Sequence, residues 1–226
     1  QALEPESPLG YRIAGEAHAR KGELPQAIAS LEKAYAIEPG ATVAVSLYRA
    51  QRRSGDRPAA LASLTRWLES DPADDTARMM LAMDHQEAGD NDKAIAAYEK
   101  IFSHQPENAT ALNNLAWLYF ERNDPRALEH SKRAYALEPK RAEIADTYGW
   151  IVLQKSDPKE ALRVLQDASI RAPHIPSVRY HLAVALSRNG QQERARKELE
   201  QLLREKPEFP EVEAATQLLR EVSAQP

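Results

Sequence analysis

Proline recurs along the chain at an almost constant spacing. Successive members of one set of seven lie 33 or 34 residues apart: Pro5, Pro39, Pro72, Pro106, Pro139, Pro173 and Pro207. Proline lacks a backbone N–H and clashes with the preceding helical turn, so it marks helix ends rather than helix interiors. A fixed period of about 20 to 50 residues is typical of repeat architectures. We therefore predict an array of tandem units, each closed by a proline.

Two amphipathic stripes in each unit predict two helices. An alanine lies twelve residues before each of the last six prolines, and small or apolar residues usually follow it four and seven positions later, as at Ala27, Leu31 and Ala34. Residues with this spacing share one face of a helix. An earlier segment of each unit carries a second stripe that ends in most units at a small residue, such as Gly149 or Ala183. We expect the two helices of a unit to approach closely at these small residues.

The connection between the two helices of a unit also has a signature. In four units it contains a glycine: Gly22, Gly55, Gly89 or Gly190. Glycine adopts the left-handed backbone conformation that ends many helices at little cost. Asn123 replaces the glycine in the fourth unit and Ser156 replaces it in the fifth, so those two turns are expected to differ in shape.

Three dipeptides predict helix starts, because a capping side chain followed by proline is typical of a helix N-terminus. They are Ser7-Pro8, Asp124-Pro125 and Asp157-Pro158. Glu160 follows Asp157 by three residues, as in a capping box.

Together these features resemble the tetratricopeptide repeat, in which L-A/G, A-x₃-L/Y, A and P recur over 34 residues. The resemblance covers essentially the whole chain and implies an all-α fold, a right-handed superhelix (solenoid) of six helix-turn-helix units. We place the units at 8–40, 41–74, 75–107, 108–141, 142–175 and 176–208. Residues 209–226 are expected to form a capping helix with a polar outer face. Residues 1–7 are expected to be the tail of a preceding repeat, in a segment of a larger protein.

Four phrases, at residues 111–139, 144–153, 177–186 and 209–219, indicate a narrower resemblance. They are similar to the C-terminal repeats of tetratricopeptide lipoproteins of bacterial PEP-CTERM and exosortase systems. This resemblance implies a Gram-negative envelope protein, lipid-anchored through an N-terminal cysteine outside this sequence, with exopolysaccharide-machinery proteins as partners. The alternative is a cytoplasmic adaptor that binds peptide segments.

Composition and motifs exclude several classes of function. The net charge of -4 gives no broad positive field for nucleic acid, and no apolar run is long enough to span a bilayer. Cysteine is absent, and the six histidines show no clustered ligand pattern. No phosphate-binding glycine loop or nucleophile elbow is present. We predict no catalytic, cofactor-binding or metal-binding residue, and a noncatalytic interaction scaffold rather than an enzyme.

Binding is expected on the first helices of the units, which line the concave surface of such arrays. We predict a groove for a protein or peptide segment lined by Asn113, Trp117, Phe120, Asp146, Trp150 and Tyr180. Trp117 and Trp150 lie 33 residues apart at the same repeat position, which would place them on neighbouring helices as an aromatic ladder. Packing between repeats is the other interpretation of both tryptophans. Weaker candidates are Met79, Met83, Glu87, Val184 and Arg188.

Four arginines of the second unit form a further candidate: Arg49, Arg52, Arg53 and Arg57. They could receive an acidic peptide or polyanion, or simply form a solvated face. The carboxylate clamp of some cochaperones of this family is not matched, because Glu16 follows Arg12 where the clamp has asparagine.

Overall fold

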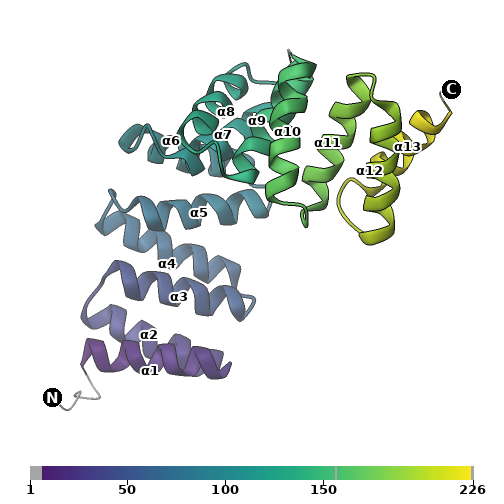
Figure 1. The fold of residues 1–226 in the computed structure, drawn as a ribbon. Coiled ribbons are helices and arrows are strands. Elements are labelled where there is room, and N and C mark those ends of the chain that lie inside the picture. The colour runs from purple at the N-terminus through teal and green to yellow at the C-terminus, as the bar shows by residue number, and fades with distance from the viewer. Residues whose placement is uncertain (1–6, 156, 225–226) are drawn as a thin grey trace. The chain divides into compact units, whose positions relative to one another are not determined.

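The computed structural model describes residues 7–155 and 157–224, and within them it contains thirteen α-helices and no strand. The fold class is therefore all-α, as predicted, and successive helices are joined by short connections (Figure 1). None of the described helices is both long and apolar enough to cross a membrane. The described residues also contain no group of three or more His, Asp or Glu side chains that could hold a metal ion.

The chain divides into two compact units. The N-terminal unit lies within Gln1–His104 and contains three helix pairs. The pairs are α1 (Pro8–Lys21) with α2 (Leu24–Ile37), α3 (Ala41–Arg53) with α4 (Arg57–Ser70), and α5 (Asp75–Glu87) with α6 (Asn91–His104). Each pair packs internally, α2 packs on α3, and α4 packs on α5. The largest fully buried side chains of this unit are Leu31, Leu47, Leu64, Tyr98 and Ile101.

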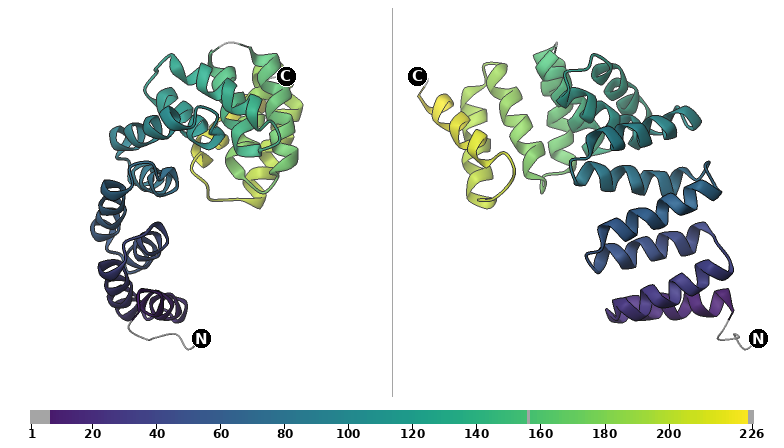
Figure 2. Two further views of the ribbon diagram at one scale, coloured as in Figure 1. Left: turned by 90° about the vertical axis from the view of Figure 1, so that its left-hand side faces the viewer. Right: turned by 180° about the vertical axis from the view of Figure 1, so that it is seen from behind.

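The C-terminal unit lies within Gln105–Pro226 and contains three pairs and a last helix. The pairs are α7 (Ala109–Glu121) with α8 (Arg126–Leu137), α9 (Ala142–Lys155) with α10 (Pro158–Arg171), and α11 (Pro176–Arg188) with α12 (Gln192–Glu205), followed by α13 (Val212–Ser223). The first helices also contact each other, α7 with α9 and α9 with α11. Figure 2 shows the pairs of each unit from two further sides. Each of the six ranges predicted from the sequence holds one helix pair, and the exact boundaries between repeats stay a prediction.

The turns inside the pairs adopt the predicted left-handed conformation. The four glycines have φ angles between 74° and 87°. Asn123 has φ 54°, so the fourth turn does not differ at this residue as expected. Asparagine tolerates this region better than most residues with a side chain, which explains how it replaces glycine here. The expectation for Ser156 falls outside the described residues.

Two of the three predicted helix starts are confirmed, and the third is shifted. The Ser7 hydroxyl accepts a hydrogen bond from the Gly10 N–H at 3.0 Å, and the Asp157 carboxylate caps α10. Helix α8 begins at Arg126, one residue later than predicted, with Pro125 at the N-cap. The Asp124 carboxylate binds both the backbone N–H and the guanidinium of Arg126, at 2.9 and 2.8 Å, which closes a turn before the helix starts.

One half of the predicted capping box is present, since the Asp157 carboxylate accepts from the Glu160 N–H at 3.2 Å, but the Glu160 side chain is used elsewhere. Its carboxylate accepts a hydrogen bond from the Tyr148 hydroxyl at 2.7 Å, which ties α9 to α10. The pKa of Tyr148 is raised to about 12, chiefly by burial and next by this hydrogen bond. The hydroxyl therefore stays protonated and remains a donor.

The small residues of the first helices lie at close contacts, as expected. A β-carbon added at Gly149 would lie 2.7 Å from Cγ of Leu165, and one at Gly15 would lie 2.6 Å from Cγ of Leu31. Ala183 is completely buried. These positions let the helices of a pair approach closely.

Candidate partner-binding surfaces

Helix α7 carries three of the predicted groove residues, and each is partly exposed. Asn113 and Trp117 are one helical turn apart and therefore lie on the same face. The Trp117 ring packs at 5.9 Å from the Phe120 ring, centroid to centroid, and its indole N–H donates to Glu121 at 2.9 Å. The indole is thus held in place while part of its surface remains open to a ligand.

Asn113 has an unusual hydrogen-bonding state. Its side-chain amide donates to the Asn114 side-chain oxygen at 3.3 Å, whereas its own Oδ1 is buried and accepts no hydrogen bond from any described residue. A buried acceptor without a donor costs free energy. The Asn113 side chain is partly exposed but this oxygen is covered, so a group from outside the chain would reach it only after the amide rotates.

Helices α9 and α11 hold the remaining three predicted residues. The Trp150 ring stacks on His181 at 4.1 Å with 22° between the planes, and lies 6.2 Å from Tyr180. His181 is buried, and its Nδ1 lies 2.9 Å from both carboxylate oxygens of Asp146. Trp150 and Tyr180 also pack against the core of this unit. Asp146 is thus engaged in joining α9 to α11.

The two tryptophans of the predicted groove have different aromatic neighbours. Trp117 packs on Phe120, and Trp150 packs on Tyr180 and His181. Sequence reasoning missed His181, since its partner Asp146 lies 35 residues away. The sequence signal that could have identified His181 is that a polar residue occupies the buried face of a first helix.

The weaker candidates occupy different environments. Val184 is buried in the core and cannot serve as a contact. Met83 is 52% exposed on α5, and Glu87 binds Arg52 at 2.9 Å. Arg188 donates to the carbonyl oxygen of Leu153 at 3.0 Å.

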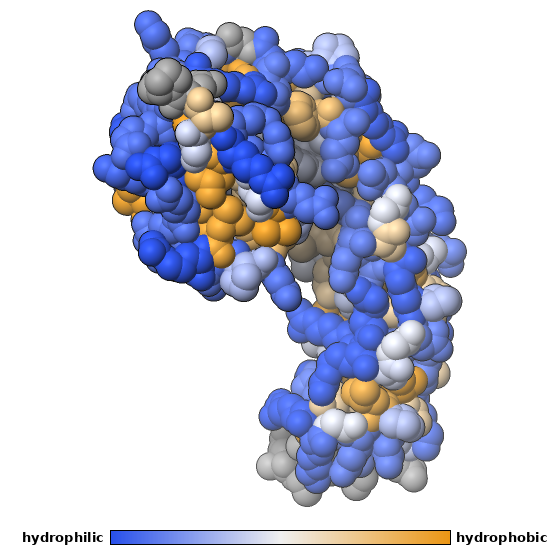
Figure 3. Space-filling model, turned by 90° about the vertical axis from the view of Figure 1, so that its right-hand side faces the viewer, coloured by the Kyte–Doolittle hydropathy of each residue, from blue (hydrophilic) through white to orange (hydrophobic). Residues whose placement is uncertain are grey.

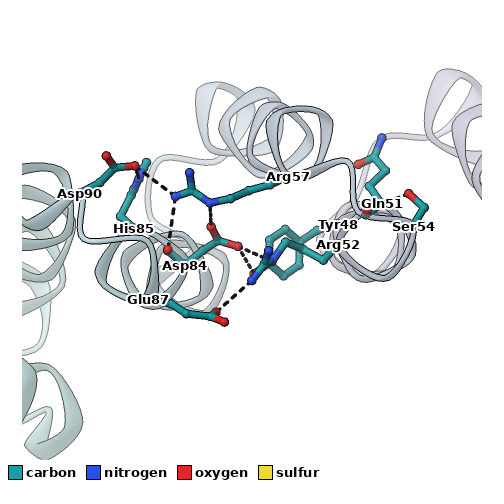
Figure 4. A network of polar contacts seen from close by, with 9 residues as sticks. All are labelled: Tyr48, Gln51, Arg52, Ser54, Arg57, Asp84, His85, Glu87 and Asp90. Atoms are coloured by element: carbon teal, nitrogen blue, oxygen red, sulfur yellow. Dashed lines mark hydrogen bonds and ion pairs between the residues drawn. The ribbon is translucent and has the colours of Figure 1, made fainter. Parts of the chain in front are cut away.

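The four arginines of the second unit fall into two groups. Arg52 and Arg57 converge on Asp84, with nitrogen-to-oxygen distances of 2.6 and 2.5 Å (Figure 4). The Asp84 side chain is completely buried and also accepts from the Tyr48 hydroxyl at 3.0 Å. Arg57 reaches Asp90 as well, at 3.1 Å. These two arginines are therefore structural and do not form a free basic surface.

Arg49 and Arg53 instead line a pocket of about 680 Å³ in the N-terminal unit. We call it the N-terminal groove. It is formed by α1, by α3 and by the start of α5, with Ala19 and Arg20 on α1, and Ala41 and Val45 on α3, among its lining residues. Arg20 was not singled out from the sequence, because it lies in a different repeat from the other arginines.

Comparison with known proteins supports the repeat assignment. Two models, both described as tetratricopeptide repeat, match residues 79–142 and 152–219, and together they cover more than half of the chain. No curated protein matches the sequence.

Solved structures share the fold at low sequence identity. A tetratricopeptide repeat protein from Parabacteroides merdae is 20% identical with a TM-score of 0.76, over 96% of this chain and 89% of that one. The pilF protein of Pseudomonas aeruginosa is 16% identical with a TM-score of 0.74, over 92% and 95%. A structure of the APC/C hetero-tetramer Cut9-Hcn1 is 16% identical with a TM-score of 0.74, and this chain spans 44% of the matched chain.

The family models, the helix pairs and the regular proline spacing agree. The chain is built from tetratricopeptide repeats.

Proposed function

We propose that the chain is a noncatalytic scaffold that holds a segment of a partner protein on the first helices of the C-terminal unit. The repeat family supports a role in protein–protein interaction. The observation that carries the proposal is the partly exposed side chain of Asn113, whose amide oxygen has no hydrogen-bond partner among the described residues, one helical turn from the partly exposed Trp117. An extended protein segment offers both complements, backbone hydrogen-bonding groups for the amide and an apolar side chain for the indole.

The neighbouring helices extend this surface. Trp150 and Tyr180 are partly exposed and held by packing, so a bound segment would meet rigid rings that lose little entropy on binding. A few such aromatic anchors usually carry most of the binding free energy. The expected ligand is a stretch of polypeptide that contacts α7, α9 and α11 in turn.

Single substitutions test this surface. Phe120 is replaced by a photo-crosslinking phenylalanine analogue, and partners from native lysate are identified with Asn113 and Trp117 intact or changed to alanine. Lys132, which is exposed on α8, carries the crosslinker in the matched control. We expect crosslinks from position 120 that either alanine variant abolishes while its thermal melt stays near that of the parent. Unchanged crosslinking in normally melting variants overturns the proposal, and a collapsed melt assigns Trp117 to packing.

We also propose that the full-length protein lies at the bacterial envelope, anchored by lipid and associated with exopolysaccharide machinery. The resemblance at residues 111–139, 144–153, 177–186 and 209–219 supports this location. Fractionation of cells that express the full gene, with metabolic labelling by a fatty acid, tests it. Recovery in the membrane fraction with label is the expected result. Recovery of unlabelled protein in the cytosol favours a cytoplasmic adaptor.

A further inference from the structure

The N-terminal groove is chemically different from the surface proposed above. Apolar side chains line part of it, among them Ala19, Ala41 and Val45. Three arginines also line it, Arg20 from α1 and Arg49 and Arg53 from α3, and all three are exposed. The groove therefore combines apolar contact area with positive charge.

The acidic side chains that line the groove are already engaged. The Glu16 carboxylate binds Arg12 at 2.7 Å. The Asp74 carboxylate accepts from the indole N–H of Trp67 at 2.7 Å and from two backbone N–H groups at the start of α5. Neither acid forms a salt bridge with the three arginines; Asp74 keeps its charge and offsets only part of theirs.

The arginines keep most of their hydrogen-bonding capacity. Arg20 and Arg49 form no ion pair or hydrogen bond with any residue that the structure describes, and Arg53 donates to the carbonyl oxygen of Ala19 at 2.7 Å. A carbonyl group leaves the charge of a guanidinium uncompensated. By contrast, Arg52 and Arg57 are paired with the carboxylates of Asp84, Glu87 and Asp90, so of the four arginines of the second unit only Arg49 and Arg53 have no carboxylate partner among the described residues.

We propose that the N-terminal groove binds an acidic peptide segment of a partner protein. Carboxylates of the segment pair with Arg20, Arg49 and Arg53, because guanidinium groups bind carboxylates with two parallel hydrogen bonds. Small apolar side chains of the segment lie against Val45 and its neighbours. The chain as a whole has a net charge of -4 and therefore repels acidic peptides. An acidic peptide should accordingly bind at the positive groove rather than elsewhere on the surface. This inference does not depend on the surface proposed for α7, α9 and α11.

The test uses the full chain and a fluorescent ten-residue peptide of alternating glutamate and valine, with binding followed by anisotropy at low and at physiological salt. The variants are Arg20→Glu and Arg49→Glu. Lys100→Glu, on the exposed face of α6, makes the same charge change outside the groove and is the matched control. We expect each arginine variant to weaken binding at least about tenfold and the control to change it less than about twofold. Melting curves should not differ, since both arginines are exposed.

Three further measurements decide between interpretations. Val45→Gln should weaken peptide binding if apolar contact contributes, and Trp117→Ala should leave it unchanged if the two surfaces are distinct. Equal loss in all three charge variants would show nonspecific attraction and overturn the proposal. Tighter binding of a single-stranded RNA oligonucleotide or of inorganic polyphosphate, with the same dependence on Arg49, would replace the acidic peptide as the ligand and also overturn it.

Discussion

The close contact between α9 and α10 requires a glycine at position 149. An added β-carbon would lie 2.7 Å from Cγ of Leu165 and 3.3 Å from Cγ1 of Val164. Real β-carbons essentially never approach a heavy atom closer than 3.0 Å, so the Leu165 side chain or one of the helices must shift. The contact therefore tests the packing register directly.

We predict that Gly149→Ala lowers the free energy of unfolding by about 1 to 3 kcal/mol, the usual cost of overpacking. Gly40→Ala is the matched control, because an added β-carbon there has no atom within 4 Å. Because Gly40 is the N-cap of α3, where alanine is less favourable than glycine, this control should cost about 0.5 to 1 kcal/mol. Urea denaturation followed by circular dichroism measures both. Equal stability of the two variants would contradict the register.

His130 makes stability depend on pH. The ring is buried on α8, where Nδ1 donates to the Arg126 carbonyl oxygen at 3.0 Å. Burial lowers its pKa below the ordinary value of 6.5, so the folded chain favours neutral imidazole. As pH falls through 6.5, the unfolded chain gains a proton that the folded chain resists. The contribution of His130 is thus complete above pH 6.5 and decreases below it.

The corresponding experiment compares free energies of unfolding at about pH 7.5 and 5.5. We expect the loss of stability on acidification to be smaller in His130→Gln than in the parent. His174→Gln, at an exposed histidine, should keep the parental loss. An unchanged loss in His130→Gln would show that other titratable groups account for the acid sensitivity.

At the scale of elements, Asp84 connects three helices through charge. The carboxylate lies on α5 and receives Arg52 from α3 and Arg57 from the start of α4. Burial raises the pKa of the Tyr48 hydroxyl, with the hydrogen bond to Asp84 adding to the effect. The donors around the Asp84 carboxylate are therefore two guanidinium groups and one hydroxyl. The other carboxylates that pair with these arginines, Glu87 and Asp90, are not buried.

We predict that Asp84→Asn lowers the free energy of unfolding by about 2 to 4 kcal/mol, because the change leaves two guanidinium groups facing each other without a buried counter-charge. Asp90→Asn is the control, since Asp90 is partly exposed and contacts only one of these arginines. Chemical denaturation of both variants gives the comparison. A cost for Asp84→Asn no larger than for Asp90→Asn would show that the arginines are solvated and contribute little.

Helix α13 covers the end of the C-terminal core. It packs on α12 and α11, and it buries Ala215 and Val222. Figure 3 shows hydrophobic side chains gathered on the C-terminal unit and framed by hydrophilic residues. Removing α13 would add newly exposed apolar surface to this unit.

We predict that truncation after Lys206 lowers the melting temperature and promotes self-association, because terminal repeats need a polar outer face. Truncation after Ser223 removes no helical residue and serves as the control. Light scattering coupled to size exclusion, with thermal melts, measures both effects. A truncated chain that stays monomeric and equally stable would show that α13 is no cap.

Helices were predictable from the sequence wherever a local rule decided them. The Asp157 cap and the left-handed Asn123 follow from short-range geometry, whereas the start of α8 depends on the contact between the Asp124 carboxylate and Arg126. The Asp84 network could have been found from the sequence, because Asp84 is a charged residue at a repeat position that is apolar elsewhere. The residues at the matching position of the other repeats are Ala17, Ala50, Leu118, Ile151 and Ala185.

At the scale of the whole molecule, the period predicts the repeated helix pairs but not the two compact units. Proline spacing is the same across residue 104 as elsewhere, so nothing in the period marks a division there. The candidate groove on α7, α9 and α11 could be predicted by position, because first helices recur at fixed intervals. The engagement of Asp146 by His181 could not, since it requires the packing of two repeats.

Burial is uneven along the array, and local stability should follow it. Helix α1 buries only Gly15, whereas α9 and α11 bury most of their residues. Since each repeat contacts only its neighbours, opening should begin at poorly buried ends. We predict the slowest amide hydrogen exchange in α9 and α11 and faster exchange in α1, measured by mass spectrometry. Uniform exchange across all helices would indicate a single cooperative unit.

Asp84 also limits how this protein can be rebuilt. Repeat proteins are attractive for engineering because units can be shuffled, duplicated or exchanged like interchangeable modules. Here the acid belongs to the third repeat and its cations belong to the second, so neither module is self-sufficient. A library that recombines repeats should therefore transfer residues 41–107 as one cassette, and hybrids that separate the second and third repeats should be depleted among folded members.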